Sequence, residues 1–150
     1  MISVGLSKNV FTRSILTRSF TSSNSRYSRW SDLVDKTKTQ HGIQEISVDE
    51  LHTDLTGPVL IDVREADEWK GGKLPGAVCL PRGIIELKVE KVVSPDSDQP
   101  IVLYCAGGLR SVMAASSLVG MGYKKENIKS LKGGFGAWNK KGYTVVSHDE

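Results

Sequence analysis

The stretch IVLYCAGGLRSVMAASSLVGM, residues 101–121, decides the fold. Its first four residues, Ile101 to Tyr104, are apolar or aromatic β-formers and predict a short buried strand. The next six, Cys105 to Arg110, include two adjacent glycines and predict a loop. A helix is expected over residues 111–120. This order places Cys105 at the carboxyl end of a strand and opposite the amino end of a helix, where open α/β sheets bind their ligands.

The loop between this strand and this helix suits an activated cysteine. Gly107 and Gly108 let the backbone curl, so that several N–H groups can point at one spot. The helix start contributes about half a positive charge, and Arg110 contributes a full one. An anionic sulfur is stabilised in such surroundings, so we predict that Cys105 is a nucleophile. The alternative is a cysteine that packs as a small apolar side chain.

Four motifs in order carry a family resemblance. The loop CAGGLRS, residues 105–111, resembles the active-site loop of the rhodanese sulfurtransferases. Three further stretches match in the expected order, namely IDVRE (61–65), KLPGA (73–77) and GGFGAW (133–138). The resemblance covers about residues 44–143. It implies an α/β, rhodanese-like three-layer domain with a parallel sheet of about five strands and helices on both faces.

The resemblance also implies a reaction. The Cys105 thiolate would take the outer sulfur of thiosulfate or of a low-molecular-weight persulfide such as glutathione persulfide. The resulting Cys105 persulfide would pass that sulfur to cyanide, glutathione or a protein thiol, in two displacements with ping-pong kinetics. The reaction needs no cofactor and no metal. The three histidines, His41, His52 and His148, lie outside the motifs and are expected to be surface or linker residues.

Several residues are expected to support Cys105. Arg110 would bind the sulfonate or carboxylate end of the donor, with a structural pairing to an acid as its alternative. Asp62 and Arg64 end a neighbouring strand, and we expect an ion pair or a backbone anchor there rather than catalysis. Cys79 is expected to be inert core. The backbone N–H groups predicted to hold the anionic sulfur belong to Ala106, Gly107, Gly108, Leu109 and Ser111.

Two other function classes stay open. A cysteine phosphatase or arsenate reductase also uses a cysteine, a loop of amides and an arginine, but that loop has five residues between them, whereas Cys105 and Arg110 enclose four. The shorter loop gives a tighter cradle, which suits a sulfur atom better than a phosphate. A non-enzymatic sulfur carrier or protein-docking module is the second alternative. The intact cysteine and arginine favour an enzyme.

Charge is distributed unevenly along the 150 residues. The formal net charge is +3, yet the first 31 residues hold five basic residues and no acid, and the rest of the chain holds 15 basic and 17 acidic residues. A nearly neutral body argues against a nucleic-acid surface. No apolar run approaches the roughly 18 residues of a membrane span. Two cysteines give no disulfide framework. We expect the protein to be a monomer.

The amino-terminal segment is typical of an organelle transit peptide, because it is rich in Arg, Ser and Thr and lacks acids. We expect a mitochondrial transit peptide over residues 1–27, with cleavage near residue 20 or residue 27, and a protein of the mitochondrial matrix. A disordered basic tail is the alternative. Residues 28–42 are expected to form a linker or a loosely docked helix. The rhodanese domain is expected over residues 43–148.

The remaining elements follow from periodicity and turn residues. Beyond the strand at 101–104, strands are expected over 43–46, 59–63, 77–80 and 128–131. Helices are expected over 48–55, 65–69, 84–93 and 133–141, the third with Ile84, Leu87 and Val92 facing the core. Residues 143–146 are expected to form an edge strand or a packed tail.

Overall fold

A computed structural model describes residues 28–149 of the chain, so the predicted transit peptide lies outside the described residues. The described residues form a five-stranded sheet in which every neighbouring pair of strands is parallel. In sheet order the strands are β1 (Gln44–Ile46), β5 (Ile128–Leu131), β4 (Ile101–Tyr104), β2 (Val59–Asp62) and β3 (Val78–Cys79). The predicted α/β fold with a five-stranded parallel sheet is confirmed.

The central strand β4 is buried on both faces, as its unbroken apolar sequence predicts. Ile101, Leu103 and Cys105 face one core, whereas Val102 and Tyr104 face the other. Alternation along the strand thus divides the apolar side chains between two layers.

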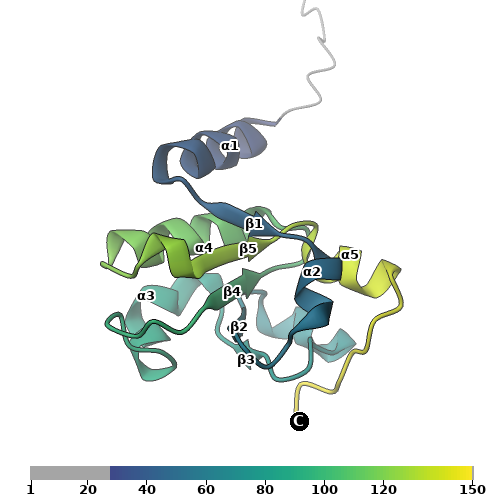
Figure 1. The fold of residues 1–150 in the computed structure, drawn as a ribbon. Helices are drawn as coiled ribbons and strands as arrows, with labels where there is room; N and C mark the ends of the chain where they lie inside the picture. Colours follow the sequence, from purple (N-terminus) through teal and green to yellow (C-terminus); the bar gives the residue numbers. More distant parts are fainter. Residues whose placement is uncertain (1–27, 150) are drawn as a thin grey trace, which may run out of the picture.

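Helices cover both faces of the sheet (Figure 1). The first core is shared by α1 (Arg29–His41), α3 (Ile85–Lys88) and α4 (Leu109–Gly120). The second core is shared by α2 (Val48–Thr53) and α5 (Gly134–Lys140). The result is a three-layer arrangement with the carboxyl ends of β2, β3 and β4 at one edge of the sheet.

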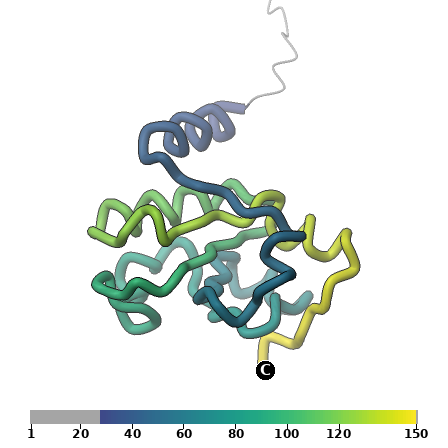
Figure 2. The backbone as a smooth tube through the Cα atoms, in the orientation of Figure 1, coloured from purple at the N-terminus to yellow at the C-terminus, as the bar shows by residue number. Residues whose placement is uncertain are grey.

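Residues 28–42, for which the sequence leaves a linker or a docked helix open, contain the helix α1. The Ser31 N–H donates to the Ser28 side chain at the start of α1, and Gly42 ends it at φ 62°. Val34 is 1% exposed, and α1 packs against α4. Figure 2 shows the chain running from α1 into the edge strand β1. This packing fixes α1 on the domain.

The helix of the central stretch starts earlier than predicted. α4 begins at Leu109 instead of Ser111, because Gly108, at φ +92°, takes the N-cap position. A Cβ at Gly108 would lie 2.9 Å from the backbone nitrogen of Gly133, so a side chain has no room there. The tight glycine turn therefore shortens the loop.

The predicted helix over residues 84–93 is wrong in detail. The segment is divided into a 3₁₀ turn (Arg82–Ile84), α3 and a second 3₁₀ turn (Val89–Lys91). Ile85 and Val89 are buried, whereas Leu87 is 78% exposed and does not face the core. The 3₁₀ turns change the angular spacing of side chains, which a single 3.6-residue period does not describe.

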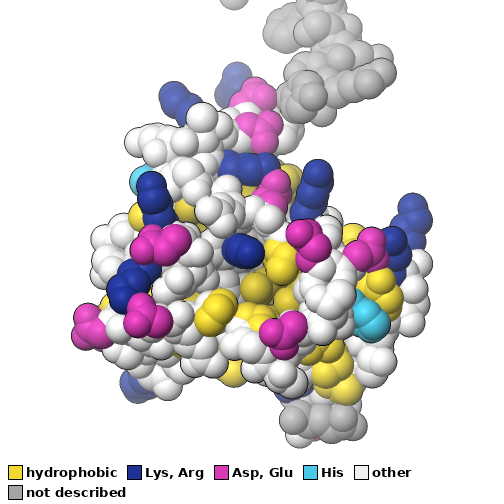
Figure 3. All heavy atoms as spheres, viewed as in Figure 1, with side chains coloured by type: hydrophobic (Ala, Val, Ile, Leu, Met, Phe, Trp, Pro, Cys, Tyr) yellow, Lys and Arg dark blue, Asp and Glu magenta, His cyan; other side chains and the backbone are white. Residues whose placement is uncertain are grey.

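Smaller differences concern the edges of the domain. The helical turn predicted at 65–69 is the 3₁₀ helix η1 (Ala66–Gly71), and β3 has only two residues. The tail at 143–146 contributes an isolated antiparallel bridge between Val146 and Lys73. Among residues 28–149, no helix is long and apolar enough to cross a membrane. Acidic and basic side chains are interspersed on the face drawn in Figure 3.

Candidate active site

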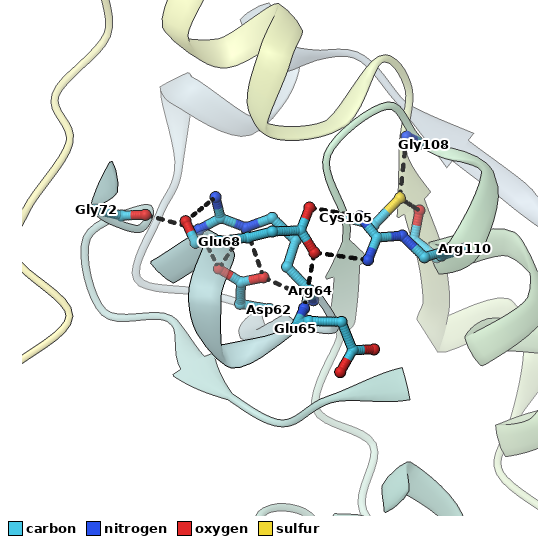
Figure 4. Close-up of polar contacts among 9 residues, drawn as sticks. Asp62, Arg64, Glu65, Glu68, Gly72, Cys105, Gly108 and Arg110 are labelled. Carbon is cyan, nitrogen blue, oxygen red and sulfur yellow. Dashed lines mark hydrogen bonds and ion pairs between the residues drawn. The ribbon is translucent and has the colours of Figure 1, made fainter. Parts of the chain in front are cut away.

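Cys105 follows β4 directly and is 1% exposed. The Gly108 N–H donates to its Sγ at 3.1 Å (Figure 4). The Ser111 Oγ lies 3.6 Å from the same sulfur and accepts a hydrogen bond of 2.8 Å from the Ser130 hydroxyl. Since Ser130 donates to Ser111, the Ser111 proton is free to point at the sulfur. One amide and one hydroxyl thus converge on the Cys105 sulfur.

The start of α5 holds the loop that carries Cys105. The Phe135 N–H donates to the Cys105 carbonyl at 2.8 Å, and the Gly136 N–H donates to the Ala106 carbonyl at 2.9 Å. Gly134, directly before Phe135, has φ +56°, and a Cβ there would lie 2.2 Å from the Cys105 carbonyl oxygen. The GGFG sequence therefore brings two backbones into contact, and it leaves the side of the loop that carries the sulfur open.

Arg110, predicted to bind the donor, forms a bidentate ion pair with Glu68 of η1. Both N–H···O distances are 2.7 Å, and each side chain is about one third exposed. The hydrogen bonds from Arg110 hold the pKa of Glu68 at about 2. The pair stays ionised at neutral pH and is lost only as the pH falls toward that value. The structural pairing that the sequence leaves open is thus the arrangement in the structure.

Asp62 and Arg64 form a buried ion pair at the carboxyl end of β2. The Arg64 Nη2 lies 2.6 Å from Asp62 Oδ2, and the guanidinium also donates to the carbonyls of Glu68 and Gly72 at 3.1 and 2.7 Å. Burial is the largest influence and opposes the charge of Arg64, but the hydrogen bonds and charge of Asp62, together with nearby Tyr104 and Glu68, raise its pKa overall. Arg64 also stacks on the Phe135 ring, 4.0 Å from its centroid. This pair anchors η1, which presents Glu68 to Arg110 (Figure 4).

A pocket opens onto the sulfur. Its walls are Trp30 of α1, Cys105 and Gly107 of the loop, and Leu109 and Arg110 of the first turn of α4. A smaller hollow at the amino ends of β2 and β4 is lined by residues such as Pro58 and Pro100 and contains no cysteine. We therefore place the candidate site at the carboxyl end of β4.

Cys79, at the end of β3, does not line the pocket at Cys105. Burial raises the pKa of its thiol, and the nearby Asp62 carboxylate raises it further.

No histidine lines the pocket at Cys105. His52 instead stacks on Tyr143, with ring centroids 3.9 Å apart.

Three residues of this site were not predicted from the sequence. Glu68 lies one helical turn after Arg64, and only its acidic character in a motif-flanking turn could have drawn attention to it. Ser130 is fully buried in β5, but the strand sequence IKSL also contains the polar Lys129, so the hydroxyl has no distinct signal in the sequence. Trp30 precedes the domain by more than ten residues, and no sequence pattern links it to Cys105.

Comparison with known proteins agrees with this geometry. The sequence profile of the Rhodanese-like domain matches residues 47–141, so the chain belongs to the rhodanese-like domain family. A sulfurtransferase of Allochromatium vinosum is 30% identical over 105 residues, which cover 70% of this chain and 94% of the relative. The thiosulfate sulfurtransferase GlpE of Pseudoalteromonas translucida is 37% identical over 81 residues, covering 53% of this chain and 71% of the relative.

A solved structure supports the same fold. A Rhodopseudomonas palustris protein of unknown function, described as a possible tyrosine phosphatase, superposes with a TM-score of 0.67 at 30% identity. The match covers 79% of this chain and 95% of that protein. The relatives with named activities support sulfur transfer in general as the chemistry of this family member.

Proposed function

We propose that this protein is a thiosulfate or persulfide sulfurtransferase that carries sulfane sulfur on Cys105. The observation that carries the proposal is the convergence of the Gly108 amide and the Ser111 hydroxyl on the Cys105 sulfur, at the mouth of an open pocket. A thiolate held in this way is the nucleophile that the reaction needs, and no general base is required.

The first step forms one bond and breaks one. The Cys105 thiolate attacks the outer sulfur of thiosulfate, the S–S bond of the donor breaks, and sulfite leaves with the electron pair. Cys105 then carries a persulfide anion, and the Gly108 N–H and the Ser111 hydroxyl contact its inner sulfur, Sγ. In the second step a nucleophilic acceptor, such as cyanide, glutathione or a protein thiol, attacks the outer sulfur and regenerates the thiolate. We propose that the protein acts as a monomer.

Mass spectrometry of the intact wild-type protein tests the proposal. Incubation with thiosulfate should add the mass of one sulfur atom, and cyanide should remove it. Peptide mapping should place the added sulfur on Cys105 and leave Cys79 unmodified. An unchanged mass with both thiosulfate and glutathione persulfide would refute sulfur transfer by this chain.

The Glu68→Gln variant is expected to bind thiosulfate more tightly. Without the carboxylate, the charge of Arg110 is no longer compensated, and the dianion is attracted to it. We expect KM for thiosulfate to fall about 3- to 10-fold at low ionic strength, and less in salt. The measurement is steady-state turnover with cyanide at two salt concentrations. Asp67→Asn is the matched control, because Asp67 lies in the same turn and pairs with Lys70 instead; an equal change there would contradict the role of Glu68.

Phosphatase activity is the second enzymatic candidate. It is considered because the similar R. palustris structure is described as a possible tyrosine phosphatase. The loop from Cys105 to Arg110 has one residue fewer than a phosphatase loop, and Arg110 is engaged by Glu68. We therefore expect no hydrolysis of p-nitrophenyl phosphate. A sulfur carrier without turnover is distinguished by a Cys105 persulfide that cyanide does not discharge catalytically.

We further propose that residues 1–27 direct the protein to the mitochondrial matrix. The support is the acid-free sequence, with Arg and Ser spaced among apolar residues. A fluorescent fusion of the full chain should locate to mitochondria, and a fusion lacking residues 1–27 should not.

A further inference from the structure

The pocket at Cys105 has an apolar wall that the sulfur chemistry does not require. Trp30 is 41% exposed and Leu109 is 39% exposed, and both line the pocket. They are two of the five large apolar side chains that are exposed among the described residues. Covering apolar surface with a ligand removes it from water and so favours binding. This wall therefore suits a ligand that has an apolar part next to its reacting sulfur.

The position of Trp30 is fixed by the helix that carries it. Ser28 caps the start of α1, and Val34, one turn further on, is buried against the domain. The cap fixes the start of the helix, and the packing of α1 against α4 fixes where this helix lies on the domain. Trp30 is thus presented to the pocket by a packed element.

The charge of the pocket lining also favours an organic donor. Arg110 is the basic residue of the pocket lining, and its guanidinium is matched by two hydrogen bonds to the Glu68 carboxylate. An inorganic dianion thus finds backbone amides but no uncompensated cation in this lining. A donor with a single negative charge and a carbon substituent fits the pocket better.

We propose that Trp30 and Leu109 bind the carbon substituent of an organic sulfur donor, so that thiosulfonates and persulfides with an aromatic or apolar substituent are preferred over inorganic thiosulfate. This inference rests on the proposed sulfurtransferase function. In the reaction the Cys105 thiolate attacks the outer sulfur of R–SO₂–S⁻, the S–S bond breaks, and the sulfinate R–SO₂⁻ leaves with the electron pair. Trp30 contacts R and takes no part in bond breaking.

Two donors that differ in R test the inference. Benzenethiosulfonate presents a phenyl ring and methanethiosulfonate presents a methyl group, and cyanide accepts the sulfur from both. Trp30→Ala is expected to lower kcat/KM for benzenethiosulfonate about 5- to 10-fold and to change the value for methanethiosulfonate less than about 2-fold. The change in the ratio of the two values cancels the intrinsic reactivity of the donors. Trp30→Phe should retain most of the preference.

Leu33→Ala is the matched control, because Leu33 is a large apolar side chain exposed on the same helix and does not line the pocket. It should leave both donors unchanged. An equal loss for both donors in Trp30→Ala, or no loss for either, would overturn the inference. A wild-type protein that takes sulfur from no donor would instead overturn the proposed function itself.

A binding measurement gives a readout without turnover. In a Cys105→Ser background, benzenesulfinate should bind with a Kd that Trp30→Ala raises about 5- to 10-fold. Methanesulfinate should bind weakly to both forms. An unchanged Kd for benzenesulfinate would show that the ring does not contact Trp30 and would overturn the inference.

Discussion

Replacing Cys105 by serine should abolish sulfur uptake and lower turnover with thiosulfate and cyanide by at least about 1,000-fold. A serine hydroxyl in the same place is a far weaker nucleophile than a thiolate. The measurement combines steady-state rates with the intact mass after exposure to thiosulfate. Both should report the loss together, because persulfide formation is the first step of the proposed mechanism.

Cys79→Ser is the control for this prediction. Burial raises the pKa of the Cys79 thiol, and Cys79 does not line the pocket at Cys105. The variant should take up one sulfur atom and turn over as the wild type does. Substantial turnover by Cys105→Ser, or an equal loss in Cys79→Ser, would contradict the assignment of the persulfide to Cys105.

Replacing Arg64 by methionine should give the largest loss of stability. The substitution leaves the carboxylate of Asp62, which is fully buried, without its cation. Breaking a buried pair in this way costs about 3–5 kcal/mol in the free energy of unfolding. The carbonyls of Glu68 and Gly72 lose a donor as well. Thermal unfolding followed by circular dichroism should show Tm lowered by more than about 10 °C.

Two further variants test the physical reason for this loss. Asp62→Asn combined with Arg64→Met removes the uncompensated charge and should be more stable than Arg64→Met alone. Arg82→Met, which removes an ion pair of partly exposed side chains with Glu86, should cost less than about 1 kcal/mol. Similar losses in Arg64→Met and Arg82→Met would contradict a special role for burial at Arg64.

Activity should also respond to Arg64, although indirectly. Arg64 holds η1 through two backbone carbonyls, and η1 carries the Glu68 carboxylate that pairs with Arg110. A loosened η1 would therefore change the charge at the pocket before the loop of Cys105 itself is disturbed. Arg64 is thus a positioning residue, in agreement with the anchoring role that its place after a strand suggests.

The local pattern of the chain determined much of this protein. An unbroken apolar run predicted the buried strand β4, and the glycines and cysteine after it predicted a loop at its carboxyl end. Both follow from local chemistry, because burial on two faces requires apolar residues and a tight loop requires glycine. The four motifs in order were sufficient to indicate the family that the profile match confirms.

Tertiary structure decided the rest, because it depends on which distant residues meet. Arg110 pairs with Glu68 across 42 positions, and Ser130 reaches Ser111 across 19, and neither contact has a local signature. Trp30 lies at the pocket of Cys105 because α1 packs on α4. The polar sequence of the segment that forms α1 is equally compatible with an unpacked linker. The sequence therefore specified the candidate nucleophile Cys105 and its loop, whereas long-range packing specified the charge and the apolar wall of the pocket around it.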